Sequence, residues 1–346
     1  MSTDPPQTIE NEQLLEEWLS QPSEAAVASL RRIPGDVIVL GAGGKMGPSL
    51  TGMLRRATQQ GGPPRQIFAA SRFSNQHVRQ RLVEQGIETI ACDLTKDDAW
   101  ASIPVVPNVF LMTGYKFGTQ TDPSMTWATN VLLTAEVCRR YRHSRIVVFS
   151  SGNLYSMVTP ESGGSLENDS ANPVGEYAMT TLGRERMVEY LSKQFDICAA
   201  LIRLNYAVEL RYGVLLDLAR QVYEERVIDL TMGYVNVIWQ GDANAMAIAS
   251  LADANCPPYI LNVAGPEILK VKDVCQRFGE YFKKQVQFSG EEGELAYLNN
   301  GVAGHLSYGK PRISAERLIE WVAAWTAAGG LTYDKPTHFQ VQDGKY

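Results

Sequence analysis

The chain has 346 residues, and its hydrophobic content of 45% is enough to bury one large core or two lobes. A net charge of −6 gives no electrostatic footprint for nucleic acid or for an anionic membrane surface. The five cysteines lack CxxC spacing and the four histidines lack HxxxH or HExxH spacing, so we expect reduced thiols and no metal site. The polar, acidic N-terminus predicts no signal peptide, and no apolar run approaches the ~18 residues of a membrane span. These features predict a soluble cytoplasmic protein.

Residues 1–35 are expected to form a separate N-terminal extension. Apolar residues between Leu14 and Leu30 recur at mixed helical spacing, and Gln21-Pro22-Ser23 interrupts them. This pattern predicts two short helices. The helices either pack on the main body or form a contact in a homodimer, and the pattern favours neither arrangement.

The segment after this extension carries the most informative motif. Four apolar residues, Val37–Leu40, run directly into GAGGKMG, in which Gly41, Gly44 and Gly47 are spaced three apart. A helical pattern begins at Pro48. A strand, a glycine turn and a helix N-terminus suit a pyrophosphate, because glycine lets backbone N–H groups approach and the helix dipole favours an anion. The glycine triplet alone is weak evidence, since loops use glycine freely for positive φ angles.

Strand and helix patterns alternate from Val37 onwards. The expected strands are Val37–Leu40, Gln66–Ala70, Glu88–Ala91, Asn108–Met112, Arg145–Ser150 and Ile197–Leu204. The expected helices are Pro48–Thr58, Asn75–Glu84, Pro123–Tyr141 and Glu176–Gln194. This alternation predicts an α/β fold with a doubly wound parallel sheet, a Rossmann domain, over residues 36–204. Ligands of such sheets bind beyond the carboxyl ends of the strands.

Residues 205–330 are less regular and are expected mainly to form a smaller substrate-binding lobe over the carboxyl edge of the sheet. The expected elements are helices at Arg211–Glu225, Asp242–Ala252 and Val271–Lys283, a last helix from Ser314 to Gly329, and a late Rossmann strand at Tyr259–Val263. Residues 205–235 and 285–310 carry no motif. Residues 331–346 are expected to be a polar tail.

The ends of the second and third strands bear on the choice of cofactor. In NAD-selective sites a carboxylate at the end of the second strand binds the ribose 2′-OH. This chain has Ser71 and Arg72 there, and an arginine pairs with a 2′-phosphate, which favours NADP. Arg72 is equally well explained as an ordinary surface residue. After the third strand, Asp93 and Leu94 offer a short acidic turn for adenine, although aspartate also commonly starts a helix.

Further motifs lie downstream, namely Ser150-Ser151-x-x-x-Tyr155, Pro173-x-x-x-Tyr177 with Glu185 eight residues later, Leu201–Asn205, Asn236–Asp242 and Leu261–Val263. Together with GAGGKMG, these motifs resemble the extended short-chain dehydrogenase/reductase family of the NAD-dependent epimerase/dehydratase type. The resemblance covers roughly Val37 to Gly329, and the combination is far more specific than any single part. It implies hydride transfer between a substrate carbinol and a nicotinamide.

The resemblance also implies roles for individual residues. Tyr177 would be the general acid/base, and Ser151 would hydrogen-bond the reacting oxygen. The implied cofactor-binding residues for NADP or NAD are Gly41, Gly44, Lys45, Met46, Gly47, Ser71, Arg72, Asp93, Leu94, Thr113, Gly114, Lys116, Tyr177 and Asn205. The implied substrate-binding residues are Ser151, Asn153 and Arg211, and Tyr206, Glu209 and Tyr212 are also placed to contact a substrate.

One position departs from the family pattern. The mechanism needs a lysine four residues after the tyrosine, where its charge favours the phenolate, and this chain has Thr181 there. A phenol with a pKa of about 10 is otherwise a poor base at neutral pH. Lys116, after the fourth strand, is the candidate replacement, and a solvated loop lysine is the alternative. Arg184 is the other nearby cation and is expected to make a structural ion pair.

These observations lead to two functional hypotheses. The first is an epimerase or dehydrogenase acting on a hydroxyl of a sugar, nucleotide-sugar or sugar acid, with Lys116 as a third catalytic residue. The second is a sensor or scaffold that binds a dinucleotide without turnover, as the loss of lysine at Thr181 would allow. The dehydratase branch is disfavoured, because Gly152 and Asn153 occupy the positions of its Asp-Glu pair. We expect no nucleic acid or membrane partner.

Overall fold

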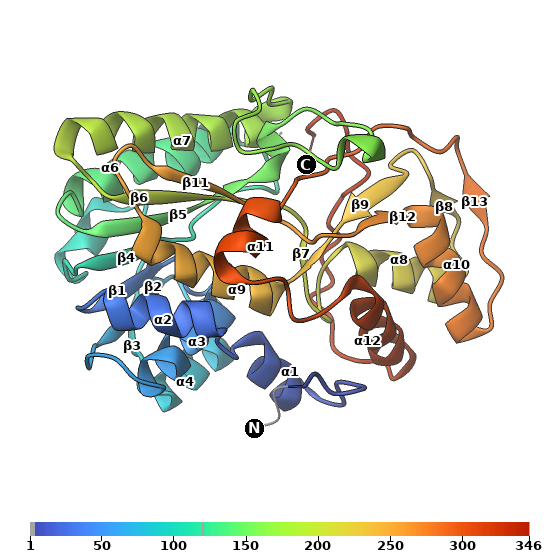
Figure 1. Ribbon diagram of the computed structural model, residues 1–346, viewed down its shortest axis with the longest axis horizontal. Helices are drawn as coiled ribbons and strands as arrows, with labels where there is room; N and C mark the ends of the chain where they lie inside the picture. The colour runs from blue at the N-terminus through green and yellow to red at the C-terminus, as the bar shows by residue number, and fades with distance from the viewer. Residues whose placement is uncertain (1–3, 120, 346) are drawn as a thin grey trace.

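The computed structural model describes residues 4–119 and 121–345. The strands of its central sheet are β1 Val37–Leu40, β2 Ile67–Ser71, β3 Glu88–Ala91, β4 Asn108–Leu111, β5 Arg145–Ser151, β6 Ala199–Leu204 and β11 Tyr259–Val263. These seven strands are all parallel and lie in the order β11-β6-β5-β4-β1-β2-β3 (Figure 1). The predicted doubly wound parallel sheet is confirmed.

The helices and the remaining short strands surround this sheet. The helices are α1 Glu12–Leu19, α2 Glu24–Arg32, α3 Gly47–Gln59, α4 Gln76–Glu84, α5 Pro123–Trp127, α6 Leu133–Arg140, α7 Gly175–Phe195, α8 Val214–Tyr223, α9 Gln240–Ala249, α10 Val271–Phe282, α11 Val302–Tyr308 and α12 Ala315–Ala327. The short strands are β7 Ala207–Val208, β8 Ile228–Asp229, β9 Tyr234–Asn236, β10 Ile238–Trp239, β12 Ile268–Lys270 and β13 Phe288–Ser289.

Alternating side chains of β1 pack against two different layers of helices. Val37 and Val39 belong to the cluster that includes residues of α2, α3 and α9, whereas Ile38 and Leu40 belong to the cluster with α6 and α7. All four are fully buried, as expected for a strand covered on both faces. The strand order reverses between β1 and β4, so their carboxyl ends flank the crevice where such sheets bind ligands.

One predicted helix contains a π-helical segment, and another begins later than predicted. The predicted helix Pro123–Tyr141 contains a π-helical segment, Ala128–Leu132, between α5 and α6. Asn130, in this segment, accepts a hydrogen bond from the Tyr115 N–H and donates one to the Tyr115 carbonyl. The helix predicted from Arg211 begins only at Val214, because Gly213 has a φ of +139°, which ends any regular structure before it.

The two predicted N-terminal helices are present and pack on the body of the protein. Asn11 and Ser23 cap α1 and α2 through their side chains. In α1, Leu15 and Leu19 are fully buried, and the Trp18 ring lies 6.3 Å from that of Trp321 in α12. A contact of this segment in a homodimer stays a prediction.

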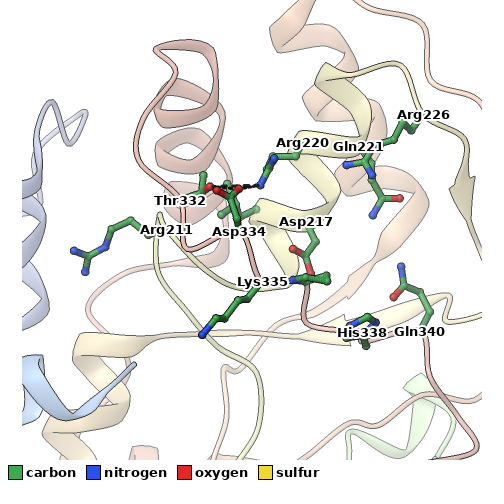
Figure 2. A pocket seen from close by; sticks show the side chains of 12 residues that line it. Arg211, Asp217, Arg220, Gln221, Arg226, Thr332, Asp334, Lys335, His338 and Gln340 are labelled. Atoms are coloured by element: carbon green, nitrogen blue, oxygen red, sulfur yellow. Dashed lines mark hydrogen bonds and ion pairs between the residues drawn. The ribbon is translucent and has the colours of Figure 1, made fainter. Parts of the chain in front are cut away.

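The tail after α12 lies against the lobe rather than away from it. Figure 2 shows Asp217 and Arg220 of α8 beside tail residues Asp334 and Lys335. Arg220 forms an ion pair with Asp334 at 2.8 Å. Phe339 is only 3% exposed and joins the core of the lobe, so the stretch predicted as a polar tail includes a buried anchor.

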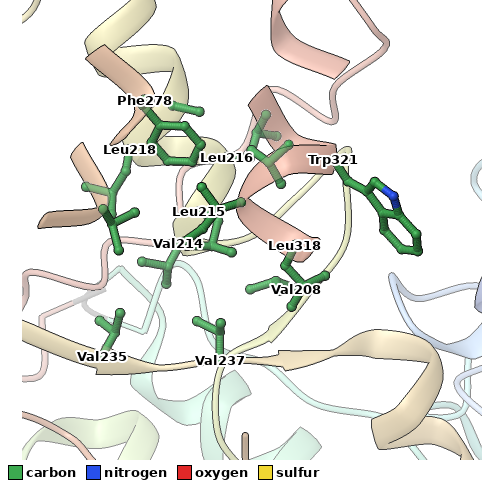
Figure 3. Packing of buried hydrophobic residues seen from close by; sticks show 14 of the residues in the cluster. Val208, Val214, Leu215, Leu216, Leu218, Val235, Val237, Phe278, Leu318 and Trp321 are labelled. Atoms are coloured by element: carbon green, nitrogen blue, oxygen red, sulfur yellow. The ribbon is translucent and has the colours of Figure 1, made fainter. Parts of the chain in front are cut away.

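The lobe between residues 205 and 330 has a core of its own. Its apolar side chains come from α8, α10 and α12 and from the segment that leads into β10, as Figure 3 shows for Val208, Leu215, Val237, Phe278 and Trp321. Two short pairings, β12 with β9 and β13 with β8, fall in stretches for which the sequence predicted no strand. The domain boundaries after residues 35, 204 and 330 stay predictions.

Within the described residues, no helix is both long and apolar enough to cross a membrane. The same residues contain no group of three or more His, Cys, Asp or Glu side chains able to hold a metal ion. None of the five cysteines, all within the described residues, forms a disulfide.

Candidate active site

The glycine turn after β1 has a shape that only glycine permits at two of its positions. Gly41 has a φ of +92°, and a Cβ there would lie 2.8 Å from the backbone nitrogen of Thr113. A Cβ on Gly47 would lie 2.5 Å from the carbonyl oxygen of Ala42. Gly44 has more room, since its Cβ would meet only the Gly41 carbonyl oxygen at 3.3 Å. The turn therefore leaves Gly44 as the place for a close approach by a ligand.

A cavity of about 390 Å³ opens beside this turn at the carboxyl edge of the sheet. It gathers residues from seven separate parts of the chain. The predicted site residues that line it are Gly41, Gly44, Lys45, Met46, Gly47, Thr113, Gly114, Lys116, Ser151, Asn153 and Tyr177. The structure thus brings together the glycine turn, the β4 loop, the end of β5 and the start of α7.

Lys116 and Tyr177 lie side by side in this cavity. The Lys116 Nζ atom is 5.5 Å from the centre of the Tyr177 ring. Thr181, at the family's lysine position, also lines the cavity, but its hydroxyl donates a 2.8 Å hydrogen bond back to the Tyr177 carbonyl. This bond lies within the helix, and threonine brings no charge to the tyrosine. Lys116, and not Thr181, therefore brings a positive charge close to the Tyr177 ring.

The cavity contains a second lysine, from the glycine turn itself. The Lys45 Nζ atom lies 3.1 Å from the centre of the Tyr212 ring and 4.9 Å from that of Phe117. Burial, and then the charges of Lys116 and Lys335, lower the pKa of Lys45 to about 7. Burial also lowers the pKa of Lys116 to about 8. The cavity thus crowds ammonium groups together, which disfavours their charged forms unless an anion joins them.

Arg184 does not form the structural ion pair that the sequence predicted. Its guanidinium donates to the carbonyl oxygens of Phe149 (2.6 Å), Thr113 (2.7 Å) and Asn130 (3.1 Å) and to the Asn130 side chain. All of these acceptors are neutral, and burial lowers the pKa of Arg184 to about 10. The prediction failed because four oxygens from the β4 loop, β5 and the π-helical segment converge on this one side chain. Arg184 thereby ties α7 to the strand ends that form the cavity.

Ser151 reaches the cavity from the end of β5, and Asn153 lies beside it. The Asn153 N–H donates to the Ser151 hydroxyl oxygen at 3.2 Å. Behind them, Ser150 donates to Glu185, which also forms a buried ion pair with Arg203 at 2.7 Å. Burial alone lowers the pKa of Arg203, but the hydrogen bond and charge of Glu185 outweigh it and raise the pKa above its ordinary value. These interactions of Ser150, Glu185 and Arg203 hold the end of β5 in place behind the cavity.

The residues predicted to meet the adenosine half of the cofactor lie outside the cavity. Ser71 is half-buried at the end of β2, and Arg72 next to it is exposed. Asp93 accepts two hydrogen bonds from Thr95, through its N–H at 3.1 Å and its hydroxyl at 2.8 Å. Slight desolvation raises the pKa of Asp93, but the bonds from Thr95 and the charge of Arg72 outweigh it and lower the pKa. The structure therefore brings Arg72 and Asp93 near each other, beyond the ends of the paired strands β2 and β3.

Asn205 is not brought to the cavity. It is 1% exposed and donates hydrogen bonds to the Asn236 side chain and the Tyr297 carbonyl. These partners turn it toward the lobe.

Arg211 is not brought to the cavity either, although Tyr206 and Tyr212 beside it are. Its guanidinium pairs with Glu209 at 3.1 Å and with Glu16 of α1 at 2.7 Å. These two carboxylates neutralise the positive charge of Arg211, which the sequence had predicted to bind a substrate.

Several features of the cavity fit a dinucleotide. The glycine turn leaves space at the N-terminus of α3, and no side chain among the described residues caps that helix. The Thr113 hydroxyl, at the end of β4, is buried without a hydrogen-bond partner in the described part of the chain. A helix N-terminus free of a cap and an unsatisfied hydroxyl are what a bound pyrophosphate and ribose would engage.

Gln240 and Thr337 are among the residues that line the cavity without having been predicted from the sequence. Gln240, at the start of α9, lines the cavity and donates to Ser49 of α3. Thr337, from the tail, lines the opposite side. The one signal for the tail was Phe339, a large apolar residue in a polar stretch, which suggests burial.

The parallel sheet, the glycine turn and the Ser–Tyr pair beyond the strand ends define a protein of the Rossmann class with a candidate active site. Residues 37–228, more than half of the chain, match the NAD dependent epimerase/dehydratase family. The chain belongs to this family, as the sequence motifs predicted, and the members of the family are enzymes. No curated protein matches the chain.

Solved structures with the same fold include two epimerases and a dehydratase. UDP-glucuronic acid 4-epimerase of Bacillus cereus, in complex with UDP-glucuronic acid and NAD, has 14% identity and a TM-score of 0.69, over 85% of this chain and 99% of that chain. UDP-glucose 4-epimerase of Thermus thermophilus, in complex with NAD, has 15% identity and a TM-score of 0.68, over 84% and 98%. A dTDP-glucose 4,6-dehydratase of Streptomyces venezuelae, with NAD bound, has 13% identity and a TM-score of 0.72, over 84% and 96%.

Proposed function

We propose that this protein is an NAD(P)-dependent epimerase or dehydrogenase that acts on a hydroxyl of a sugar, nucleotide-sugar or sugar acid. The observation that carries the proposal is the distance of 5.5 Å between the Lys116 ammonium and the Tyr177 ring. Both residues line one cavity with Ser151 and the glycine turn. A positive charge at this distance favours the phenolate, which is the form of tyrosine that takes a proton.

Each of these residues has a definite task in the proposed reaction. The nicotinamide, when bound, supplies the acceptor and donor of hydride. Tyr177 takes the proton of the substrate hydroxyl at its phenol oxygen and returns it in the reverse step. Ser151 hydrogen-bonds the same substrate oxygen and orients it. Lys116 stabilises the charge on Tyr177, while Arg184 holds the β4 loop and β5 at a fixed distance from α7.

The arrangement of the β5 turn supports redox chemistry rather than elimination. A Cβ added at Gly152 would lie 2.5 Å from the side-chain nitrogen and oxygen of Asn299. An acidic side chain therefore has no room at the position where the dehydratase branch carries one. Asn153, the next residue, cannot exchange protons at neutral pH.

The choice between NAD and NADP rests on Arg72. Its exposed guanidinium stands at the end of β2, and no carboxylate follows β2 directly. A guanidinium binds a phosphate in a bidentate manner, so we propose that NADP binds more tightly than NAD. The protein is proposed to act in the cytoplasm.

The alternative, binding of a dinucleotide without turnover, rests on Thr181. Its hydroxyl is used within α7, so the family's lysine has no substitute at that position. The two proposals differ in what Lys116 does.

The test is a panel of sugars, sugar acids and nucleotide-sugars, each incubated with protein and cofactor while reduced nicotinamide is followed by its fluorescence. The proposal expects reduction with at least one compound, and loss of the signal in Tyr177→Phe and Lys116→Ala with cofactor binding retained. Wild-type protein that binds cofactor, never reduces it and converts no compound of the panel into its epimer would establish the binding-only alternative.

A further inference from the structure

The tail is held across the cavity by contacts with three separate parts of the protein. Thr337 donates two hydrogen bonds to one oxygen of Asp217 in α8, from its N–H at 2.7 Å and its hydroxyl at 2.6 Å. The His338 ring lies 6.1 Å from that of Phe117 in the β4 loop. Near the end of the chain, Gly344 packs so closely on Val174 and Gly175 that a Cβ would lie 2.4 Å from the Val174 oxygen. The tail therefore bridges the lobe and the start of α7.

Successive residues of the tail line two different cavities. Thr337 lines the inner cavity beside Tyr177, whereas its neighbours Pro336 and His338 line an outer cavity of about 400 Å³ (Figure 2). The outer cavity also contains Arg220 and Gln221 of α8. The backbone from Pro336 to His338 is thus the wall between the two spaces.

The inner cavity is small for what the proposed reaction requires of it. Its volume of about 390 Å³ lies near the lower end of the roughly 300–1,000 Å³ found for ligand pockets. The reacting end of the cofactor must occupy part of this space, because the cavity reaches from the glycine turn to Tyr177. The remainder suits a single sugar ring better than a sugar with a nucleotide attached.

The same cavity carries an excess of positive charge. Lys45 and Lys116 line it, and Lys335 of the tail is close enough to Lys45 to lower its pKa. Neither Lys45 nor Lys335 forms an ion pair with any carboxylate of the described residues. The acidic groups nearest to Lys45 are Asp217, which Thr337 engages, and Glu209, which pairs with Arg211.

We propose that the inner cavity takes a small anionic sugar derivative, with a carboxylate or a phosphate held by Lys45 and Lys116 and attracted by the charge of Lys335, which lines the outer cavity, and that the tail closes the inner cavity to nucleotide-sugars. This inference rests on the proposed function, and it narrows the substrate class within it. An anion relieves the repulsion among the three ammonium groups, so it gains more from them than a neutral sugar does.

The test is calorimetric titration of the full-length protein, with and without saturating NADP, using glucuronate, glucose 1-phosphate, glucose and UDP-glucuronate. Glucuronate or glucose 1-phosphate should bind about tenfold more tightly than glucose or UDP-glucuronate. Whichever of these two anions binds more tightly shows whether the cavity prefers a carboxylate or a phosphate. Lys45→Met and Lys335→Met should each weaken anion binding about tenfold, while Lys193→Met, at an exposed site on α7, should not change it.

Removal of the tail after Gly330 tests the closure. The ratio of the affinity for UDP-glucuronate to that for glucuronate should be about tenfold higher in the shortened protein than in the full-length protein. Phe339→Ala, which loosens the buried anchor in the intact chain, gives the same comparison if the shortened protein does not fold. UDP-glucuronate or glucose binding to the wild-type protein as tightly as the anions would overturn the inference. Cofactor binding is measured separately, so failure of the anion site is distinguishable from failure of the proposed function.

Discussion

The Lys116 ammonium lies 5.5 Å from the centre of the Tyr177 ring, although 61 positions, 116 to 177, separate the two residues in the chain. They meet because β4 and β5 are neighbours in the sheet, and α7 follows β5 across its edge. In the family pattern the charge comes from the helix that carries the tyrosine. Here we propose that it comes from Lys116 in the loop after β4, and the proposed chemistry depends on that change.

A lysine at position 181 should interfere with this arrangement. Thr181→Lys places a further ammonium in the cavity that Lys116 and Arg184 already line, and the added like charge should lower turnover about tenfold or more. In a Lys116→Ala background the same change should instead restore turnover, because the family's arrangement is then recreated. Steady-state rates of the single and double variants check this. Higher activity of Thr181→Lys alone would indicate a degenerate site rather than a rebuilt one.

Gly44→Ala should weaken cofactor binding without unfolding the protein. A Cβ at Gly44 meets only the Gly41 oxygen at 3.3 Å, so the fold tolerates it, yet the methyl group occupies the space for a pyrophosphate. We expect about a tenfold loss of affinity and little change in melting temperature. Gly304→Ala in α11 is the control, because its Cβ would also meet its nearest atom, a side-chain carbon of Leu261, at 3.3 Å. Unchanged cofactor affinity in Gly44→Ala would place the pyrophosphate elsewhere.

The strands were predictable from the sequence, and the neighbourhood of the active site was not. β1 ends where its apolar run predicts, because burial on both faces imposes a continuous apolar pattern. The predicted bounds of β3 and β11 also agree with the structure. The meeting of Lys116 with Tyr177 depends on strand order, which no local pattern encodes. The sequence predicted an ion pair for Arg184, because no sequence pattern reveals that backbone carbonyl oxygens will be its acceptors.

Cofactor choice should depend on Arg72. Arg72→Ala removes the guanidinium at the end of β2 and should weaken NADP binding about tenfold while leaving NAD binding nearly unchanged. Fluorescence titration with both reduced cofactors measures the ratio. Equal losses for NADP and NAD would mean that Arg72 does not face the 2′-phosphate.

The buried pair behind the site should contribute strongly to stability. Glu185 is fully buried, accepts a hydrogen bond from Ser150 and pairs with Arg203, so Glu185→Ala leaves a buried positive charge without its partner. The free energy of unfolding should fall by about 3–5 kcal/mol, measured by urea denaturation. Glu189→Ala removes an exposed ion pair with Arg186 and should cost about 0–1 kcal/mol. A similarly small loss for Glu185→Ala would show that the buried ion pair does not contribute strongly to the stability of the fold.

Binding of glucuronate should weaken as the pH rises. Lys45 is charged below its lowered pKa of about 7 and neutral above it, and Lys116 follows at about 8. Lys335 lowers the pKa of Lys45 further, while Asp217 and Glu209 oppose this shift. Since the carboxylate of glucuronate stays ionised, its affinity should fall about tenfold between about pH 6 and about pH 9. Constant affinity over this range would show that the charges of these lysines do not hold the anion.

The central claim is that Lys116 supplies the charge that lets Tyr177 act as a base, and a pH–rate profile of Lys116→Met tests it most directly. The measurement is the rate of nicotinamide reduction in a single turnover with saturating cofactor and the best sugar of the panel. At neutral pH the rate should fall about 100-fold, and it should recover as the pH approaches the ordinary phenol pKa of about 10. A wild-type rate at neutral pH, or a loss of equal size at every pH, would contradict the account.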